Sequence, residues 1–221
     1  MKKPLLILLI IISANLTFAQ QVNFGLKLGI SNSILLENYN GTTSSTGGIN
    51  NVDIGAYADI KFGNFTVQPG LAYFLKGGGG GSSYTYSTST GTATFYDQVL
   101  RLHYIELPVN ALYNIPIKAG KFFIGAGPYV AYAVVGKSET FTSTSNSGTV
   151  TKSSTTDVTF GSGVNDLQRF DYGINVLGGF RFNNGLELGI AYGLGLQNLS
   201  NQPNFSAKNA TGSINIGYFF K

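Results

Sequence analysis

The chain of 221 residues contains no cysteine and no tryptophan, and its single histidine is His103. Without cysteine, disulfide bonds, thiolate metal sites and cysteine nucleophiles are excluded. A catalytic role for His103 would need an acid and a serine close to it, and Glu106 lies three residues further along the same segment. No second histidine and no compact cluster of acidic residues accompanies it. We therefore expect no metal site, no cofactor and no enzymatic activity.

Charged residues are scarce as well. They make up 11% of the sequence, 43% is hydrophobic, and glycine occurs 30 times. A soluble domain usually has about 25% charged residues, so this composition favours a membrane protein or an all-β protein. The full sequence has 14 basic and 10 acidic residues, and without Lys2 and Lys3 of the N-terminus 12 basic residues remain, a net charge of +2 that is too balanced to indicate binding to nucleic acid.

The N-terminus has the parts of a secretory signal peptide. Two lysines precede the apolar stretch Leu5–Phe18, and Thr17 and Ala19 are small residues three positions and one position before a cleavage point. A membrane anchor is the alternative, but a spanning helix needs about 20 apolar residues, and this stretch is shorter. No long apolar run follows residue 20. We expect residues 1–19 to be a cleaved signal peptide and residues 20–221 to form one exported domain.

From Val22 onward, apolar residues recur at every second position, which predicts β-strands. The pattern occupies eight segments, each close to the length of about 9 to 11 residues that a tilted strand needs to cross a bilayer. Two-residue and three-residue turns are predicted at Gly63-Asn64 and at Asn183–Gly185. The eight segments are Val22–Ile30, Asn51–Phe62, Phe65–Leu75, Val99–Tyr113, Lys121–Val135, Arg169–Arg181, Leu186–Gln197 and Asn209–Phe220.

The fourth segment changes phase in its middle. Leu100, Leu102 and Tyr104 share one parity, whereas the apolar residues from Ile105 to Tyr113 share the other. One extra residue near Tyr104 would bring both sets onto the same face, so we predict a β-bulge there.

The connections between the segments alternate between short and long. Those after the second, fourth and sixth segments have two, about seven and three residues, as expected for periplasmic turns, and the others are long enough to be extracellular loops. We therefore predict an eight-stranded antiparallel up-and-down β-barrel that spans the outer membrane. The long connections are Asn32–Asn50, Gly77–Gln98, Lys137–Leu167 and Asn198–Lys208.

Two of the long connections have a biased composition. Gly77–Gly81 is followed by serines and lacks the Lys-Ser/Thr of a phosphate-binding loop, so we interpret it as part of a flexible extracellular loop. Thr140–Thr159 is rich in Ser and Thr, and we interpret it as a solvated surface loop. The alternative is a hairpin that extends above the membrane and contacts a partner.

Alternation does not itself decide which face meets lipid, because a soluble lipocalin-like barrel also has eight strands. The polar face is rich in glycine and carries charges of both signs, which suits a narrow interior, and the apolar face is too bulky to fit inside. We therefore place the apolar face in lipid and expect a paired polar network that fills the lumen and leaves no channel. The predicted network comprises Lys27, Asp53, Asp59, Lys61, Glu106, Arg169, Asp171, Arg181 and Glu187.

Aromatic residues of the apolar face gather towards the ends of the segments, as in the girdles of membrane barrels. Near the short turns they are Phe62, Phe65, Tyr113, Phe122, Phe182, Tyr218 and Phe220, and near the long loops they are Tyr73, Tyr104, Tyr132, Tyr172 and Tyr192.

Several stretches are similar to the PorT family of outer-membrane β-barrel proteins. Leu102–Val109 resembles the Y-L-E-I-P stretch of that family, and Gly125–Tyr129 resembles its G-x-G-P-Y. Asp171–Ile174 and Ile214–Phe220 look like its sixth strand and its aromatic last strand, although this chain ends in Lys221. The resemblance implies an integral outer-membrane barrel, and its founding member is linked to protein secretion and surface assembly.

The sequence thus leads to one main hypothesis and two alternatives. The main hypothesis is an integral outer-membrane barrel that acts as a non-enzymatic structural or interaction protein. It would contact outer-membrane lipid, the barrel-assembly machinery through its last strand, and an extracellular or secretion-system protein. A PorT-like accessory in protein secretion and a small passive pore remain as alternatives.

Overall fold

The computed structural model describes residues 22–80, 83–89, 91–144 and 150–220, so the predicted signal peptide (residues 1–19) lies outside the described residues. No helix in these ranges is long and apolar enough to cross a membrane. The strands within them are β1 (Val22–Tyr39), β2 (Thr42–Ser45), β3 (Ile49–Phe62), β4 (Phe65–Gly79), β5 (Ser83–Ser87), β6 (Thr92–Ile117), β7 (Gly120–Thr144), β8 (Val150–Asp157), β9 (Phe170–Phe182), β10 (Leu186–Gly195) and β11 (Phe205–Phe219).

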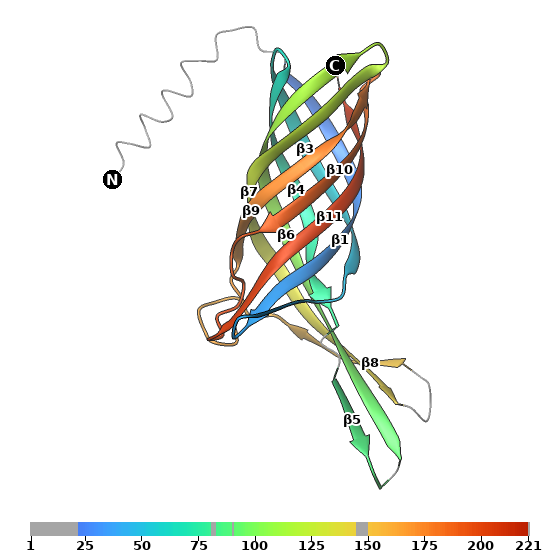
Figure 1. Cartoon of the computed structure of the whole chain (residues 1–221), viewed down its shortest axis with the longest axis vertical. Coiled ribbons are helices and arrows are strands. Elements are labelled where there is room, and N and C mark those ends of the chain that lie inside the picture. The colour runs from blue at the N-terminus through green and yellow to red at the C-terminus, as the bar shows by residue number, and fades with distance from the viewer. Residues whose placement is uncertain (1–21, 81–82, 90, 145–149, 221) are drawn as a thin grey trace, which may run out of the picture.

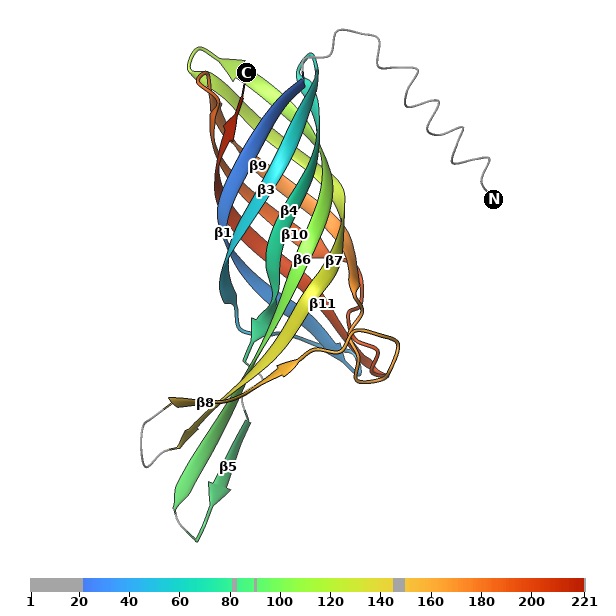
Figure 2. The same cartoon turned by 180° about the vertical axis from the view of Figure 1, so that it is seen from behind.

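Eight of these strands close into a ring. The antiparallel pairs run in the order β1, β3, β4, β6, β7, β9, β10 and β11, and β11 pairs with β1 again. Figures 1 and 2 show the resulting barrel, whose strands are tilted relative to its long axis, from two sides. The prediction of an antiparallel all-β fold with a ring of eight strands is confirmed.

The two ends of the barrel differ. One end, here called the turn end, carries the short turns and the described chain ends at Val22 and Phe220. At the other, here called the loop end, β2 pairs with β1, β5 with β6 and β8 with β7. There β5, β6, β7 and β8 form a sheet that extends well beyond the barrel (Figures 1 and 2) and is called the projecting sheet below.

Two of the three short turns have the predicted length. Gly63-Asn64 joins β3 to β4, and Asn183–Gly185 joins β9 to β10, with Gly185 at a φ of 96° that favours glycine. The third turn was predicted to have about seven residues but has only two, Lys118 and Ala119. Strand β6 continues to Ile117, which pairs with Gly120, and its apolar alternation continues through Ile115 and Ile117.

The first three long connections are largely strand, so the interpretation of Thr140–Thr159 as a solvated surface loop was wrong, and the alternative of a hairpin that extends beyond the barrel is what β7 and β8 form. Strand β1 extends to Tyr39, β6 begins at Thr92, β7 runs to Thr144 and β11 begins at Phe205. Ser and Thr in these extensions form strands without apolar alternation, because neither face of the extensions is in lipid. In the glycine run, Gly77 pairs with Arg101 inside β4, and Gly81 lies outside the described residues.

The pairing of β6 with β7 is irregular at the predicted place. Tyr104 is opposite Ala133 but His103 is opposite Val135, so the additional residue is Val134 of β7. Strand β6 keeps its parity, and Tyr104 points inward with 0% of its surface exposed. The prediction that placed Tyr104 on the apolar exterior was therefore wrong. An extra residue in either of two neighbouring strands shifts their register, and the sequence of one strand does not identify which strand carries it.

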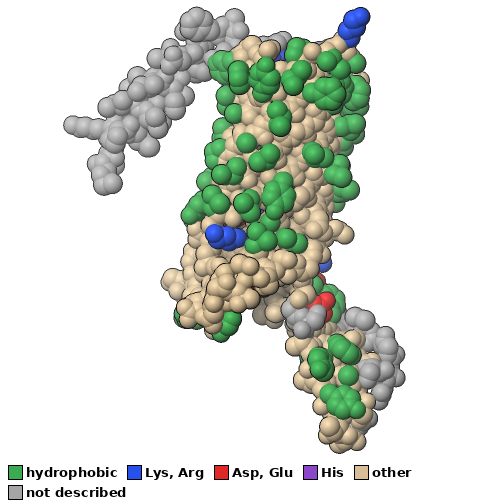
Figure 3. All heavy atoms as spheres, viewed as in Figure 1, with side chains coloured by type: hydrophobic (Ala, Val, Ile, Leu, Met, Phe, Trp, Pro, Cys, Tyr) green, Lys and Arg blue, Asp and Glu red, His purple; other side chains and the backbone are tan. Residues whose placement is uncertain are grey.

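Apolar side chains cover the outside of the barrel. Figure 3 shows them spread over the face of the wall that is in view, with few charged side chains among them. The predicted girdle at the turn end is exposed, and it comprises Phe62, Phe65, Tyr113, Phe122, Phe182, Tyr218 and Phe220. Closure of the ring leaves no unpaired strand edge in the wall, as a hydrocarbon environment requires.

Candidate functional site in the lumen

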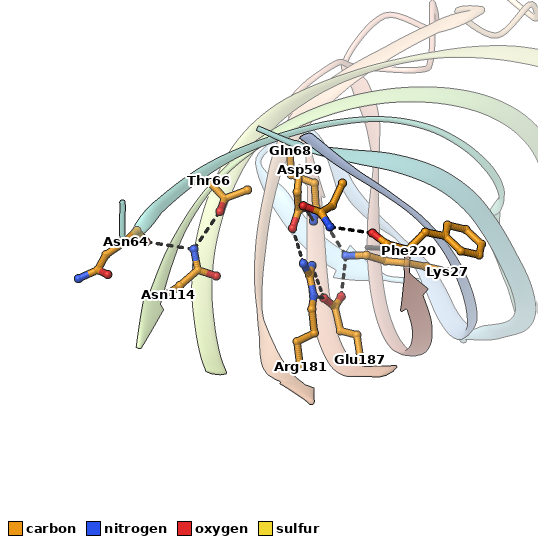
Figure 4. Close-up of polar contacts among 10 residues, drawn as sticks. Lys27, Asp59, Asn64, Thr66, Gln68, Asn114, Arg181, Glu187 and Phe220 are labelled. Carbon is orange, nitrogen blue, oxygen red and sulfur yellow. Dashed lines mark hydrogen bonds and ion pairs between the residues drawn. The ribbon is translucent and has the colours of Figure 1, made fainter. Parts of the chain in front are cut away.

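A cluster of charged side chains fills the lumen towards the turn end (Figure 4). Lys27 Nζ lies 2.9 Å from Glu187 Oε1 and donates to Gln68 Oε1 at 3.1 Å. Gln68 Nε2 donates to Asp59 Oδ1 at 2.8 Å, and Arg181 Nη1 is paired with the other oxygen of Asp59. Arg181 Nε and Nη2 reach Glu187 Oε2 at 2.7 and 2.6 Å. These five residues, here called the lower cluster, join five strands of the ring.

Aromatic rings support the lower cluster. The guanidinium of Arg181 lies over the ring of Phe219, 3.5 Å from its centre, and the Lys27 ammonium is 4.7 Å from the centre of the Tyr57 ring. Gly25 makes space for Phe219, because a Cβ atom there would lie 2.5 Å from the phenyl ring. The glycines of the polar face thus leave room for large side chains that extend across the lumen.

A second cluster, here called the upper cluster, lies nearer the loop end. Lys76 Nζ is 2.7 Å from Glu106 Oε2 and 3.5 Å from Asp171 Oδ2. Tyr129 Oη and Asn209 Nδ2 donate to Asp171 Oδ2 at 3.2 and 3.0 Å. The two clusters contain six of the nine predicted lumen charges, and each charge within them has a partner of opposite sign.

Lys76 was not among the predicted lumen residues. It follows Leu75, the last apolar residue of the predicted segment Phe65–Leu75, and precedes a glycine run. Its parity was informative, because it continues the inward series of Thr66 and Gln68, both of which are buried. Extending the alternation by one residue would have identified it.

A small cavity of about 50 Å³ lies between the clusters. Asp53, Asn110 and Asn215 line it, and each has a buried side-chain oxygen without a hydrogen-bond partner among the described residues. Gly29 is opposite both Asp53 and Asn215, which places these two side chains in one layer of the lumen. A water molecule needs about 10–15 Å³ of such space, so this polar cavity has room for a few waters.

An apolar layer closes the lumen at the loop end. Leu102 and Tyr104 are fully buried there, together with Leu35, Ala133 and Leu199. Leu102 was predicted on the exterior with Tyr104. It faces inward because the additional residue is Val134 of β7, so β6 keeps one parity throughout. These five residues, here called the apolar seal, separate the upper cluster from the space outside the barrel.

Three predicted residues lie apart from the two clusters. Asp53 is buried at the cavity, and Lys61 is half-buried near the turn end. Arg169 is at the loop end, where its Nη1 donates to Ala133 O at 3.1 Å and its guanidinium lies 4.5 Å from the centre of the Phe160 ring.

His103 is on the outward parity of β6, where its Nδ1 contacts the hydroxyl of Tyr73. Glu106 is buried in the lumen, so the two side chains are on opposite sides of the barrel wall. The described residues contain no group of three or more His, Asp or Glu that is placed to hold a metal ion.

A closed antiparallel ring with an apolar exterior and a charged interior defines the class of membrane β-barrels. The chain belongs to the outer membrane protein beta-barrel domain family, whose model matches residues 18–201. This assignment supports a location in the outer membrane. The family comparison does not distinguish the PorT family within this larger group.

Solved structures of outer-membrane proteins are similar to the chain at low identity. Ail, the attachment invasion locus protein of Yersinia pestis, is 10% identical over 90% of this chain and 99% of its own, with a TM-score of 0.44. Neisserial surface protein A is 13% identical over the same shares, with a TM-score of 0.41. The Pseudomonas putida toluene transporter TodX is 9% identical over 90% of this chain and 89% of its own, with a TM-score of 0.24. No curated protein matches the chain.

Proposed function

We propose that the chain is an exported outer-membrane protein that spans the bilayer as an eight-stranded up-and-down barrel. It acts as a non-enzymatic platform that holds the projecting sheet outside the cell. The turn end faces the periplasm and the loop end faces the medium. The surrounding lipid and, through β11, the barrel-assembly machinery are its partners in the membrane.

The projecting sheet is the observation that carries this proposal. Tyr84 and Tyr86 of β5 are 69% and 61% exposed, and the ring of Tyr84 lies 6.0 Å from that of Phe95. Exposed groups of large apolar side chains mark interaction sites on protein surfaces. A sheet with such a face beyond the membrane suits contact with an extracellular protein.

The lumen supports the same proposal. The two charge clusters occupy its width, the cavity between them is about 50 Å³, and the apolar seal covers the loop end. An interior of eight strands is just wide enough for side chains to fill. A small passive pore would need both clusters and the seal to move aside.

The proposal is tested by trimming the projecting sheet. Residues 81–97 and 139–155 are each replaced with Asn-Gly, which closes the two hairpins near the barrel. We expect the trimmed protein to keep its heat-modifiable migration on gels, because its ring is intact. A photo-crosslinking residue at position 84 of the untrimmed protein should give a protein adduct on whole cells, and the same residue at Tyr113 in the wall should not.

Other outcomes would favour the alternatives. Loss of heat-modifiability on trimming would show that the sheet is needed for the barrel to fold, against the platform. Conductance steps in planar bilayers would indicate a passive pore. A knockout with an altered secretome and no crosslinked surface partner would favour a PorT-like accessory in protein secretion, which the sequence resemblance suggests.

A further inference from the structure

A cup of about 620 Å³ opens at the loop end, above the apolar seal. Extended β1, β2, the glycines that end β4, β6, β7 and the chain after β8 surround it. Its volume is within the range of about 300–1,000 Å³ that is typical of small-molecule sites. The cup lies at the base of the projecting sheet, where Gln98, Ser138 and Asp157 line it, and does not include the exposed aromatic face of β5, so this inference goes beyond the proposed function.

The floor of the cup is apolar and closed. Leu35, Leu100 and Leu167 line it, and Leu35 also belongs to the apolar seal beneath. Leu102 and Leu199 of the apolar seal belong to the same hydrophobic cluster as Leu35 and are almost fully buried. A molecule that enters from outside therefore meets a dead end and an apolar surface, as in a binding site, and has no route into the polar lumen.

One carboxylate in the cup is not neutralised. Glu37 is on the inward parity of β1, lines the cup and has no hydrogen bond or ion pair to another described side chain. The other acid of the cup, Asp157, is 3.8 Å from Lys137 Nζ. Nearby, Glu139 is paired with Arg101 at 3.5 Å. The charge that remains unpaired in the cup is therefore negative.

The upper wall of the cup is made of small polar groups. Ser44 and Ser138 line it, and Ser138 Oγ accepts a hydrogen bond from Gln98 Nε2 at 2.9 Å. Serine hydroxyls are acceptors as well as donors, so they can take the ammonium hydrogens that a carboxylate leaves free. The wall thus complements a compact cation, and the floor complements an apolar group attached to it.

We propose that the cup binds a small organic monocation, a primary ammonium with an apolar body. The ammonium pairs with Glu37 near the opening, and the body rests on the leucines of the floor. The charge-assisted hydrogen bond to Glu37 makes the site prefer a cation over a neutral or anionic ligand, and the buried apolar surface gives the remaining affinity.

The test uses 2-phenylethylammonium as the probe and the full mature chain in lipid nanodiscs. 2-Phenylethanol and 3-phenylpropionate are matched neutral and anionic probes, and empty nanodiscs correct for partition into lipid. We expect the protein to bind the ammonium at least about tenfold more tightly than the alcohol in calorimetry, since a charge-assisted hydrogen bond is replaced. The propionate should show no binding.

Glu37→Gln should remove the preference for the ammonium over the alcohol, and Glu37→Asp should restore part of it. Asp97→Asn is the matched control, because it removes an exposed carboxylate from the same end of the protein outside the cup. Heat-modifiable migration verifies that each variant is folded. No binding by the unaltered protein, equal binding of ammonium and alcohol, or unchanged binding by Glu37→Gln would each overturn the proposal.

The pH dependence gives a second readout. Glu37 lies opposite Ser44 of β2, beyond the membrane-spanning part of β1, and burial raises the pKa of its carboxyl above the ordinary value. The carboxylate is charged above that pKa, so ammonium binding should weaken as the pH falls through it. Asp157 with Lys137 also faces the cup, and the Glu37→Gln variant shows whatever pH dependence that pair contributes.

Discussion

Strands β6 and β7 run through two regions, the barrel wall and the projecting sheet, that differ in how side chains are buried. In the barrel wall their apolar side chains are exposed to lipid and their polar side chains are buried, as for Leu107 outside and Glu106 inside. In the projecting sheet the same two strands have no such division, and Phe95 and Tyr96, neighbours on opposite faces, are both exposed. The difference shows that strand formation continues where burial ends.

The two regions therefore have different sources of stability. In the wall, buried charges need their partners, because an unpaired charge in a low-dielectric interior is strongly destabilising. In the projecting sheet, backbone pairing holds the strands, and side chains contribute little because they remain in water. Substitutions in the two regions should differ accordingly, and the largest effects should come from the lumen.

Removal of Arg181 should have the largest effect. Arg181→Met leaves Asp59 and Glu187 buried without their shared cation, and we expect a loss of about 3–5 kcal/mol of unfolding free energy in urea titrations. Arg101→Met, in a partly exposed pair with Glu139, should cost about 0–1 kcal/mol. The double variant Arg181→Met, Asp59→Asn should recover much of the loss, because Glu187 keeps its pair with Lys27. Equal effects of Arg181→Met and Arg101→Met would contradict the comparison.

A cavity in the apolar seal should have the next largest effect. Leu102 is fully buried, and Leu102→Ala should cost about 2–5 kcal/mol, the range for large-to-small substitutions in packed interiors. The midpoint of the heat-modifiability transition measures it. Leu107→Ala, on the outward side of the same strand, is the matched control and should cost less because lipid fills the space. A smaller effect of Leu102→Ala than of the control would show that the seal is loosely packed.

The lower and upper clusters also show how far the sequence determines the candidate site in the lumen. A period of two assigns each strand residue to one of two faces, and six of the nine charged residues that parity places on the polar face lie in the two clusters. The partners were not predictable, because Arg181 and Asp59 are 122 positions apart on opposite strands of the ring. Their contact depends on the diameter and stagger of the closed barrel, which no single strand encodes.

The errors of prediction come from the same source. Leu102 and Tyr104 were assigned to the exterior because the additional residue is Val134, on a neighbouring strand. The loop interpretation was favoured over a hairpin for Thr140–Thr159 because strands with water on both faces have little apolar alternation to detect. Lys76 was omitted because glycines follow it.

A charge on the lipid face should have an intermediate effect. Ile190 is in the middle of β10 and faces outward. Ile190→Arg should destabilise the protein by about 2–4 kcal/mol if it lies near the midplane of the bilayer. Tyr84→Arg, at an equally exposed position of the projecting sheet, should leave stability unchanged. Reversible urea unfolding in liposomes measures both, and equal effects would mean that the two surfaces meet the same solvent.

The smallest effect should come from the aromatic face of the projecting sheet. Tyr84 and Tyr86 are on one face of β5, opposite Phe95 and Ala93 of β6, and their rings remain exposed to water. The double variant Tyr84→Ser, Tyr86→Ser should therefore change the unfolding free energy by less than about 0.5 kcal/mol, the usual range for surface substitutions. Surface crosslinking from position 95 should be lost at the same time, because the contact face is gone. A stability loss above about 1 kcal/mol would mean that these rings pack as a core, and the projecting sheet would then be a second folded unit with burial of its own.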